Sequence, residues 1–161
     1  MPTLRKKHLI GLEHIHSDDI QLFIDTGFTF REVLDRPIKK VPSLTGKNIL
    51  NFFFENSTRT RISFELAEKR LSADVTNFSA TLSSLNKGEG LKDTIQNIHA
   101  MKMDCVVMRH PSAGACLQLS KYVDSIIINA GDGSHEHPTQ ALLDMMSLEE
   151  KFGKLKGLKI A

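Results

Sequence analysis

Two kinds of apolar pattern alternate along this chain. Short continuous apolar runs have the length and the β-branched or aromatic content of strands buried on both faces, and they cover residues 48–54, 74–78, 104–109 and 125–129. Between them apolar residues recur every three or four positions, as on one face of a helix, in segments near 17–34, 58–71, 91–98, 112–121 and 138–153. Strands that alternate with helices form parallel sheets covered on both faces. The pattern therefore predicts an α/β fold: a three-layer α/β/α domain with a central four-stranded parallel sheet.

Capping residues and helix breakers mark the boundaries of these elements. Ser17 precedes two acidic residues and suits the N-cap of the first helix. Pro138 suits the first position of the last helix, and Gly153 suits its end. The segment 154–161 closes on another apolar run. We therefore expect residues 1–153 to form one domain and residues 154–161 to begin a second domain that is otherwise absent.

Composition and charge exclude several classes of protein. The 21 basic and 19 acidic residues give a formal net charge of +2, too balanced to favour nucleic acid or an anionic membrane surface as partner. The two cysteines, Cys105 and Cys116, are too few for a disulfide framework. Neither a membrane-spanning apolar stretch nor a hydrophobic signal core is present in the sequence. These features are typical of a cytoplasmic globular protein.

Candidate ligand-binding residues follow the first predicted strand. Ser57-Thr58-Arg59-Thr60-Arg61 lies where that strand gives way to a helix. A helix N-terminus presents free N–H groups and a positive dipole end, and arginine forks match phosphate oxygens. Solvated arginines on a capped helix are the alternative, but this density of donors favours an anion site.

Two later strands end in further polar residues. Arg109 closes the third strand, and the segment 129–140 after the fourth contains His137 and Gln140 one turn apart. Because ligands of open parallel sheets bind outside the carboxyl ends of the strands, we expect these side chains to lie together. A neutral imidazole and a carboxamide there suit a small carbonyl or amide, although His137 suits simple capping too. No metal is expected, because His135-x-His137 lacks a carboxylate or cysteine partner at metal spacing.

The residue pattern alone reaches no further than a small phosphorylated ligand held by donors from three strand ends. A Gly-rich nucleotide fingerprint and a Walker lysine are both absent from the sequence. The polar segment 83–90, with Ser83 and Lys87, has the composition of a solvated loop.

Taken together, these segments resemble the transcarbamoylase family over about residues 8–161. Ser57–Arg61 followed by Ser63-Phe64-Glu65 is similar to its carbamoyl-phosphate signature, and Met108–Pro111 and His137–Asp144 are similar to its second and third parts. Within the family, Thr139 and the Arg-His-Pro after Met108 resemble the aspartate-specific members. The ornithine-specific members typically carry Cys at the position of Thr139 and lack the Arg-His-Pro that follows Met108.

The resemblance implies roles for individual residues. It assigns carbamoyl phosphate binding to Ser57, Thr58, Arg59, Thr60, Arg109, His137 and Gln140. Of these it makes Arg59, Thr60, Arg109 and His137 catalytic. Ser83 and Lys87 are expected to reach the site of a neighbouring subunit and to contact aspartate there. The family implies a homotrimer, with regulatory chains as possible partners, and implies no metal or organic cofactor.

The implied reaction moves the carbamoyl group of carbamoyl phosphate to the α-amino group of L-aspartate, giving N-carbamoyl-L-aspartate and phosphate in pyrimidine synthesis. In this family most aspartate-binding residues belong to a second domain, so we expect the chain alone to turn over little. Two alternatives remain: a non-catalytic phosphate-binding or assembly module, and an ornithine transcarbamoylase.

Overall fold

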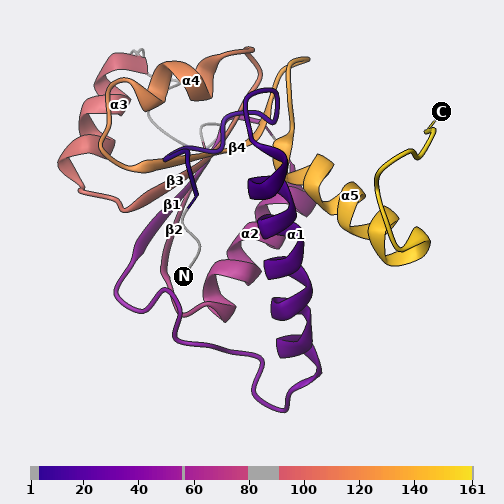
Figure 1. The fold of residues 1–161 in the computed structure, drawn as a ribbon. Coiled ribbons are helices and arrows are strands. Elements are labelled where there is room, and N and C mark those ends of the chain that lie inside the picture. The colour runs from indigo at the N-terminus through magenta and orange to yellow at the C-terminus, as the bar shows by residue number, and fades with distance from the viewer. Residues whose placement is uncertain (1–3, 56, 80–90, 161) are drawn as a thin grey trace.

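A single parallel sheet organises the molecule (Figure 1). The computed structural model describes residues 4–55, 57–79 and 91–160. Its four strands lie in the order β2-β1-β3-β4 and all neighbours are parallel. Their bounds are β1 Asn48–Phe53, β2 Asp74–Ser79, β3 Cys105–His110 and β4 Ile126–Asp132. The predicted four-stranded parallel sheet is confirmed.

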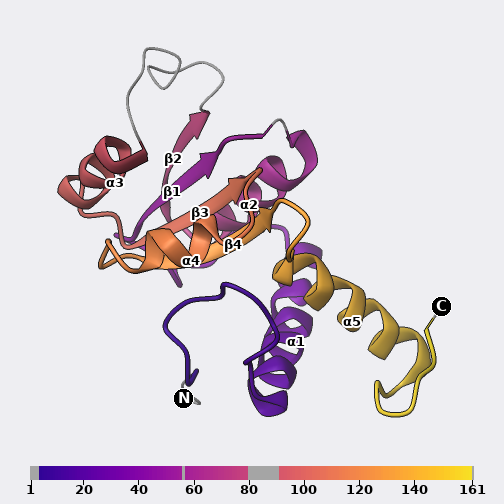
Figure 2. The same cartoon turned by 90° about the horizontal axis from the view of Figure 1, so that it is seen from above.

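Helices cover both faces of this sheet, as Figures 1 and 2 show. The helices are α1 Ser17–Arg31 with the 3-10 turn η1 Glu32–Asp35, α2 Thr58–Arg70, α3 Leu91–Ala100, α4 Ala115–Ser120 and α5 Pro138–Phe152. The α3 and α4 helices lie on one face, and α2 lies on the other. The α5 helix leaves the end of β4 and packs against α1. The three-layer α/β/α architecture is therefore confirmed.

The alternation of side chains along the strands divides the core into two parts. Leu50 and Phe52 of β1 face α3 and α4, where they join a cluster that includes Met108 and Ile127. Ile49, Phe53 and their neighbours face α2 in a second cluster. Strands buried on both faces explain why the sequence shows continuous apolar runs instead of alternation.

Three predicted boundaries differ from the structure. Ser17 is the first residue of α1, and His16 is its N-cap, with the imidazole accepting from the Asp18 N–H at 3.2 Å. The α4 helix is shorter than the predicted 112–121, because residues before it form a turn in which Gly114 takes a positive φ of 80°. The β4 strand runs to Asp132, three residues beyond the predicted end.

Both cysteines are buried and free, and burial raises the pKa of each thiol to about 12. They serve as small core residues, as predicted for Cys105. Among the described residues, no helix is long and apolar enough to cross a membrane. Residues 154–160 contain a turn and no strand, so the second domain expected from 154 onward stays a prediction.

Candidate functional site

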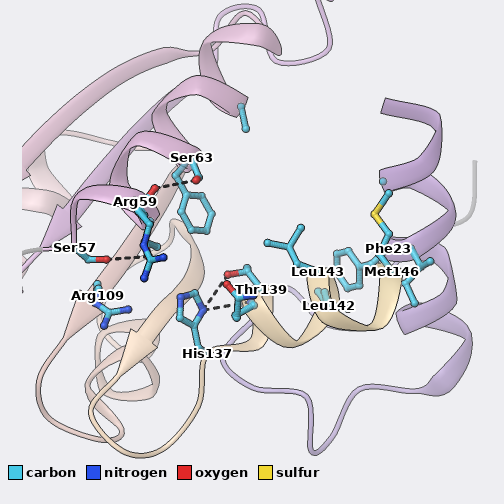
Figure 3. Close-up of a pocket in the computed structure, with 16 residues that line it drawn as sticks. Phe23, Ser57, Arg59, Ser63, Arg109, His137, Thr139, Leu142, Leu143 and Met146 are labelled. Atoms are coloured by element: carbon cyan, nitrogen blue, oxygen red, sulfur yellow. Dashed lines mark hydrogen bonds between the residues drawn. The ribbon is translucent and has the colours of Figure 1, made fainter. Parts of the chain in front are cut away.

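The turn between β1 and α2 supplies the first group of polar side chains. Ser57 occupies the N-cap position of α2, yet its hydroxyl pairs with Thr60 Oγ1 at 2.9 Å. The first N–H groups of a helix have no intrahelical acceptors, so they remain suited to an anion at this end. Arg59 extends from the first turn toward the same space (Figure 3).

Arg109, the next-to-last residue of β3, donates to two acceptors of the protein. Its Nε donates to Glu55 Oε2 at 3.1 Å, and its Nη1 donates to the Ala130 carbonyl at 3.0 Å. Its side chain is 24% exposed, so the guanidinium is partly shielded from water but still reachable. A guanidinium anchored on one side presents its remaining N–H groups in a fixed direction.

A bulge in β4 places the Ala130 carbonyl beside Arg109. The register with β3 runs from the pair Met108–Asn129 to the pair His110–Asp132, so Ala130 and Gly131 both stand opposite Arg109. Gly131 has φ of +114°, and a Cβ there would lie 2.6 Å from Arg109 Nη1 and 3.4 Å from His137 Cδ2. Only glycine accommodates this bulge with the guanidinium so close.

His137 is the N-cap of α5, and its hydrogen bonds define its tautomer. Its Nδ1 accepts from the Gln140 backbone N–H at 3.4 Å and lies 3.2 Å from Thr139 Oγ1. A backbone N–H can only donate, so Nδ1 is an acceptor and the Thr139 hydroxyl donates to it as well. The proton of the neutral ring then resides on Nε2. In Figure 3 the edge of the ring away from Thr139 faces Arg59 and Arg109.

The His137 ring is kept neutral by its surroundings. Burial lowers the pKa of His137 below its usual value, and the positive charge of Arg109 lowers it further. The positive end of α5 acts in the same direction. A neutral ring with an Nε2 proton donates a hydrogen bond to a carbonyl oxygen, and in this tautomer Nε2 cannot accept a proton from a substrate.

Gln140 lies one turn into α5 at the same pocket. Its Nε2 donates to Asp144 Oδ1 at 3.0 Å. That bond fixes the orientation of the carboxamide and leaves its oxygen to accept from an amide-type N–H group.

These side chains line one pocket of about 870 Å³. Six of the residues predicted from the sequence lie on its polar part: Ser57, Arg59, Thr60, Arg109, His137 and Gln140. Figure 3 shows the side chains of Arg59, Arg109 and His137 pointing toward one another from three different elements. The predicted gathering of distant residues at one edge of the sheet is therefore observed.

Three predicted residues are not placed in this pocket. The Thr58 side chain is exposed and is not among the residues that line it. Ser83 and Lys87 lie outside the described residues, so their predicted contact with a neighbouring subunit stays a prediction. The roles of all nine residues in binding and catalysis likewise stay predictions.

The other wall of the pocket is apolar and comes from α1, α2 and α5. It contains Phe23, Ile24, Gly27, Phe64, Ala67, Leu142, Leu143 and Met146. Gly27 allows α1 close to α5, since a Cβ there would lie 3.1 Å from the Met146 sulfur. Leu143 remains 57% exposed. A small anion would fill only the polar end of the pocket.

Sequence reasoning missed several residues that support the site. Glu55 anchors Arg109, and Thr139 fixes the tautomer of His137. Asp132 is fully buried. Burial alone would raise its pKa, but hydrogen bonds led by the one from Asn129 outweigh this, so the Asp132 pKa lies below its usual value. Gly131, at the end of an apolar strand, is the one sequence signal for this arrangement, because a glycine there indicates a bulge or a close approach of the backbone.

Within the described ranges, no group of three or more His, Cys, Asp or Glu side chains is arranged to hold a metal ion. His135 pairs instead with Asp132 at 3.1 Å. The arrangement combines two guanidinium groups, a helix N-terminus, a neutral imidazole donor and a carboxamide acceptor. It suits an anion that carries a carbonyl and an amide group beside its phosphate.

Comparison with known proteins gives a consistent result. A family model described as the carbamoyl-P binding domain of aspartate/ornithine carbamoyltransferase matches residues 7–150. The aspartate carbamoyltransferase catalytic subunit of Christiangramia forsetii is 63% identical over 153 residues, which are 95% of this chain and 49% of that protein. The corresponding subunit of Cytophaga hutchinsonii is 58% identical over 160 residues, 99% of this chain and 52% of that protein.

Solved structures agree with this result. Aspartate transcarbamoylase from Trypanosoma cruzi, crystallised with aspartate and phosphate, superposes with a TM-score of 0.86 at 36% identity and covers 94% of this chain and 49% of its own. The catalytic subunit of M. jannaschii aspartate transcarbamoylase gives a TM-score of 0.84 at 43% identity, and the match covers 95% of this chain and 50% of that chain. The chain thus spans about half the length of the relatives it matches.

Proposed function

Since this chain belongs to the aspartate/ornithine carbamoyltransferase family through its carbamoyl-phosphate-binding domain, we propose that it supplies the carbamoyl phosphate site of an aspartate carbamoyltransferase. The proposed reaction transfers the carbamoyl group to the α-amino group of L-aspartate and releases N-carbamoyl-L-aspartate and phosphate, a step of pyrimidine synthesis. The observation that carries the proposal is the convergence of Arg59, Arg109 and His137 on one pocket.

The phosphate of the substrate is expected at the N-terminus of α2. Its oxygens would accept from the first N–H groups of the helix and from the hydroxyls of Ser57 and Thr60. Arg59 and Arg109 would add charge-assisted bonds. The anchoring of Arg109 by Glu55 and Ala130 supports this role, because a guanidinium already oriented loses little freedom on binding.

The carbamoyl group is then expected beside α5. His137 Nε2–H and Arg109 would donate to its carbonyl oxygen, and the Gln140 carboxamide oxygen would accept from its amino group. When the amine of aspartate attacks the carbonyl carbon, negative charge develops on that oxygen. Donors already aimed at this position stabilise the charge without reorganisation.

Collapse of the tetrahedral intermediate completes the transfer. The carbon–oxygen bond to phosphate breaks and phosphate leaves with the electron pair. The attacking nitrogen gives up one proton to the departing phosphate, which leaves as a strongly basic trianion and becomes hydrogen phosphate. Arg59 and Arg109 neutralise the charge of the leaving group. Holding both substrates in one site contributes on the order of several kcal/mol through orientation.

The choice of aspartate over ornithine is supported by the relatives. The curated relatives named above are aspartate carbamoyltransferases. The Trypanosoma cruzi enzyme has been crystallised with carbamoyl phosphate and aspartate together. Thr139 lies directly against His137 here, at the position where the ornithine-specific members typically carry Cys.

The assembly and location are part of the same proposal. We expect a homotrimer in which Ser83 and Lys87 contact aspartate at a neighbouring subunit's site, with regulatory chains as possible partners and the cytoplasm as location. Residues 154–161 would begin the aspartate-binding domain. We expect the 161-residue chain to bind carbamoyl phosphate with little turnover, because its relatives are about twice as long.

Calorimetric titration of the chain with carbamoyl phosphate tests this proposal. Arg59→Ala should weaken binding by about 1.5–3 kcal/mol, since it removes charge-assisted hydrogen bonds. Arg61→Ala is the matched control, because it removes the same charge from the same helix at a residue that does not line the pocket. It should change the affinity by less than about 0.5 kcal/mol.

Equal losses in the two variants would mean that only net charge matters, and the proposed site would be wrong. Absence of binding in the unsubstituted chain would refute the proposal as a whole. Steady-state formation of N-carbamoyl-L-aspartate by this chain alone would refute the expectation that it supplies only one of the two substrate sites.

A further inference from the structure

Glu136 connects the site to a distant part of the chain. It directly precedes His137, and its carboxylate accepts from the Leu12 backbone N–H at 2.7 Å, across 124 positions of sequence. This short bond to a charged acceptor belongs to the stronger class of hydrogen bonds. None of the roles described above uses it.

The space around this carboxylate is closely filled. A Cβ on Gly11 would lie 2.7–2.8 Å from the Glu136 carboxylate atoms. Real Cβ atoms do not approach that closely, so any other residue at position 11 displaces the Glu136 side chain. Glycine at position 11 is therefore required by the space that the Glu136 carboxylate occupies, and not by a positive φ.

The backbone of Glu136 is fixed as well. Its N–H donates to Asp132 Oδ1 at 3.2 Å, and its carbonyl accepts from the Asp132 N–H at 3.2 Å. These bonds close the loop between the end of β4 and the start of α5. With its backbone bonded to Asp132 and its side chain bonded to Leu12, Glu136 links the loop that ends in His137 to the N-terminal segment.

Further bonds attach the same N-terminal segment to β4. Leu9 pairs with Ile128 as an isolated parallel bridge. The Leu9 N–H donates to the Ile127 carbonyl at 2.9 Å, and the Asn129 side chain donates to the Ile10 carbonyl at 2.8 Å. Residues 9–12 thus lie along the end of β4 and the loop that follows it, and the Glu136 contact is the last of these bonds along the segment.

We propose that Glu136 is a positioning residue: it attaches the loop of residues 132–137 to residues 9–12, so that the N-terminal segment sets the place of His137 in the anion pocket. The residue touches no ligand in this role. The inference rests on the proposed function for the identity of the ligand, whereas the attachment itself rests on the contacts of Glu136 with Leu12 and Gly11.

A double-mutant cycle between Gly11 and Glu136 tests the inference. We would record the ¹⁵N signals of the His137 imidazole in the ligand-free chain and measure its affinity for inorganic phosphate. Glu136→Ala and Gly11→Ala should each shift the His137 Nε2 signal and weaken phosphate binding by about threefold to tenfold, as expected for a residue that acts through another. In the Glu136→Ala background, Gly11→Ala should have no further effect, because the carboxylate it displaces is gone.

Glu136→Gln provides the conservative rescue. Its amide oxygen still accepts from Leu12 N–H, so the His137 signal should return close to its original position. Equal effects of Gly11→Ala in both backgrounds would overturn the inference, as would a loss of melting temperature with an unchanged His137 signal. If the signal shifts as expected but the unsubstituted chain binds no phosphate, the proposed function fails while the positioning role stands.

Discussion

A buried carboxyl group on the sheet-facing side of α2 gives the sharpest prediction about stability. Glu68 is only 5% exposed, and its Oε2 accepts from the Asn51 side-chain amide at 2.8 Å. Glu68 Oε1 and Asn51 Oδ1 are both buried, and neither has a partner among the described residues. One proton on Glu68 Oε1 would supply the missing donor for Asn51 Oδ1, forming a cyclic acid–amide pair.

Burial is also the main reason that the pKa of Glu68 lies above its usual value of 4.5, and the nearby charge of Glu65 raises it further. A carboxyl group with a raised pKa holds its proton in the folded chain after the unfolded chain has lost it. The contribution of Glu68 to stability is therefore fully present below pH 4.5 and is lost as pH rises through its folded-state pKa. The slope approaches about 1.4 kcal/mol per pH unit within that window.

Glu68→Gln removes this dependence. The glutamine amide supplies a permanent donor to Asn51 Oδ1 and keeps an oxygen to accept from Asn51. At pH 8 we expect the variant to be more stable than the parent chain by about 1–3 kcal/mol, the cost of unsatisfied buried acceptors. At pH 4, where the parent residue is already protonated, the difference should disappear.

Urea unfolding followed by circular dichroism from pH 4 to pH 8 measures this difference. Histidines that also titrate in this range affect both chains equally, so the difference isolates Glu68. Asp104→Asn is the control, because the charge of Asp104 is not among those that raise the pKa of Glu68. A hydrogen bond from Lys47 holds the pKa of Asp104 below its usual value, so that substitution should not stabilise the chain at pH 8. Destabilisation by Glu68→Gln at pH 8 would refute the reasoning.

Three further substitutions test how the site is built. Arg109→Lys keeps the charge but loses the anchored fork, so calorimetry should show phosphate binding weaker by about 1–2 kcal/mol, and unchanged affinity would contradict the anchoring. Thr139→Val should move the His137 proton partly to Nδ1, visible in ¹⁵N spectra, and Thr139→Ser should restore the Nε2 form. Gly131→Ala combines a strained φ of +114° with a 2.6 Å contact to Arg109 Nη1, and thermal unfolding should show a loss of more than about 1 kcal/mol.

Much of the fold follows from pattern alone. Continuous apolar runs predict buried strands because a strand with helices on both faces has no polar face. The candidate site follows from the same topology, since parallel strands bring their carboxyl ends to one edge. This is why Arg59, Arg109 and His137 could be expected together although they are widely separated in sequence.

The details that depend on side-chain contacts could not be predicted. Glu68 lies one turn after Phe64 on the buried side of α2. A charged residue on that side departs from the apolar spacing by which the sequence predicts the buried face of a helix. The anchoring of Arg109 by Glu55 depends on two residues 54 positions apart. The β4 bulge at Gly131 depends on a register shift that leaves no periodic signal. Sequence spacing carries no information about any of these contacts.

The central claim is that three separate elements enclose one anion. Side-chain ¹⁵N signals of Arg59 Nε, Arg109 Nε and His137 Nε2, followed together while carbamoyl phosphate is added to the chain, test it directly. All three signals should move with one common dissociation constant. Different constants for the three signals, or movement of Arg59 without His137, would contradict a single shared site.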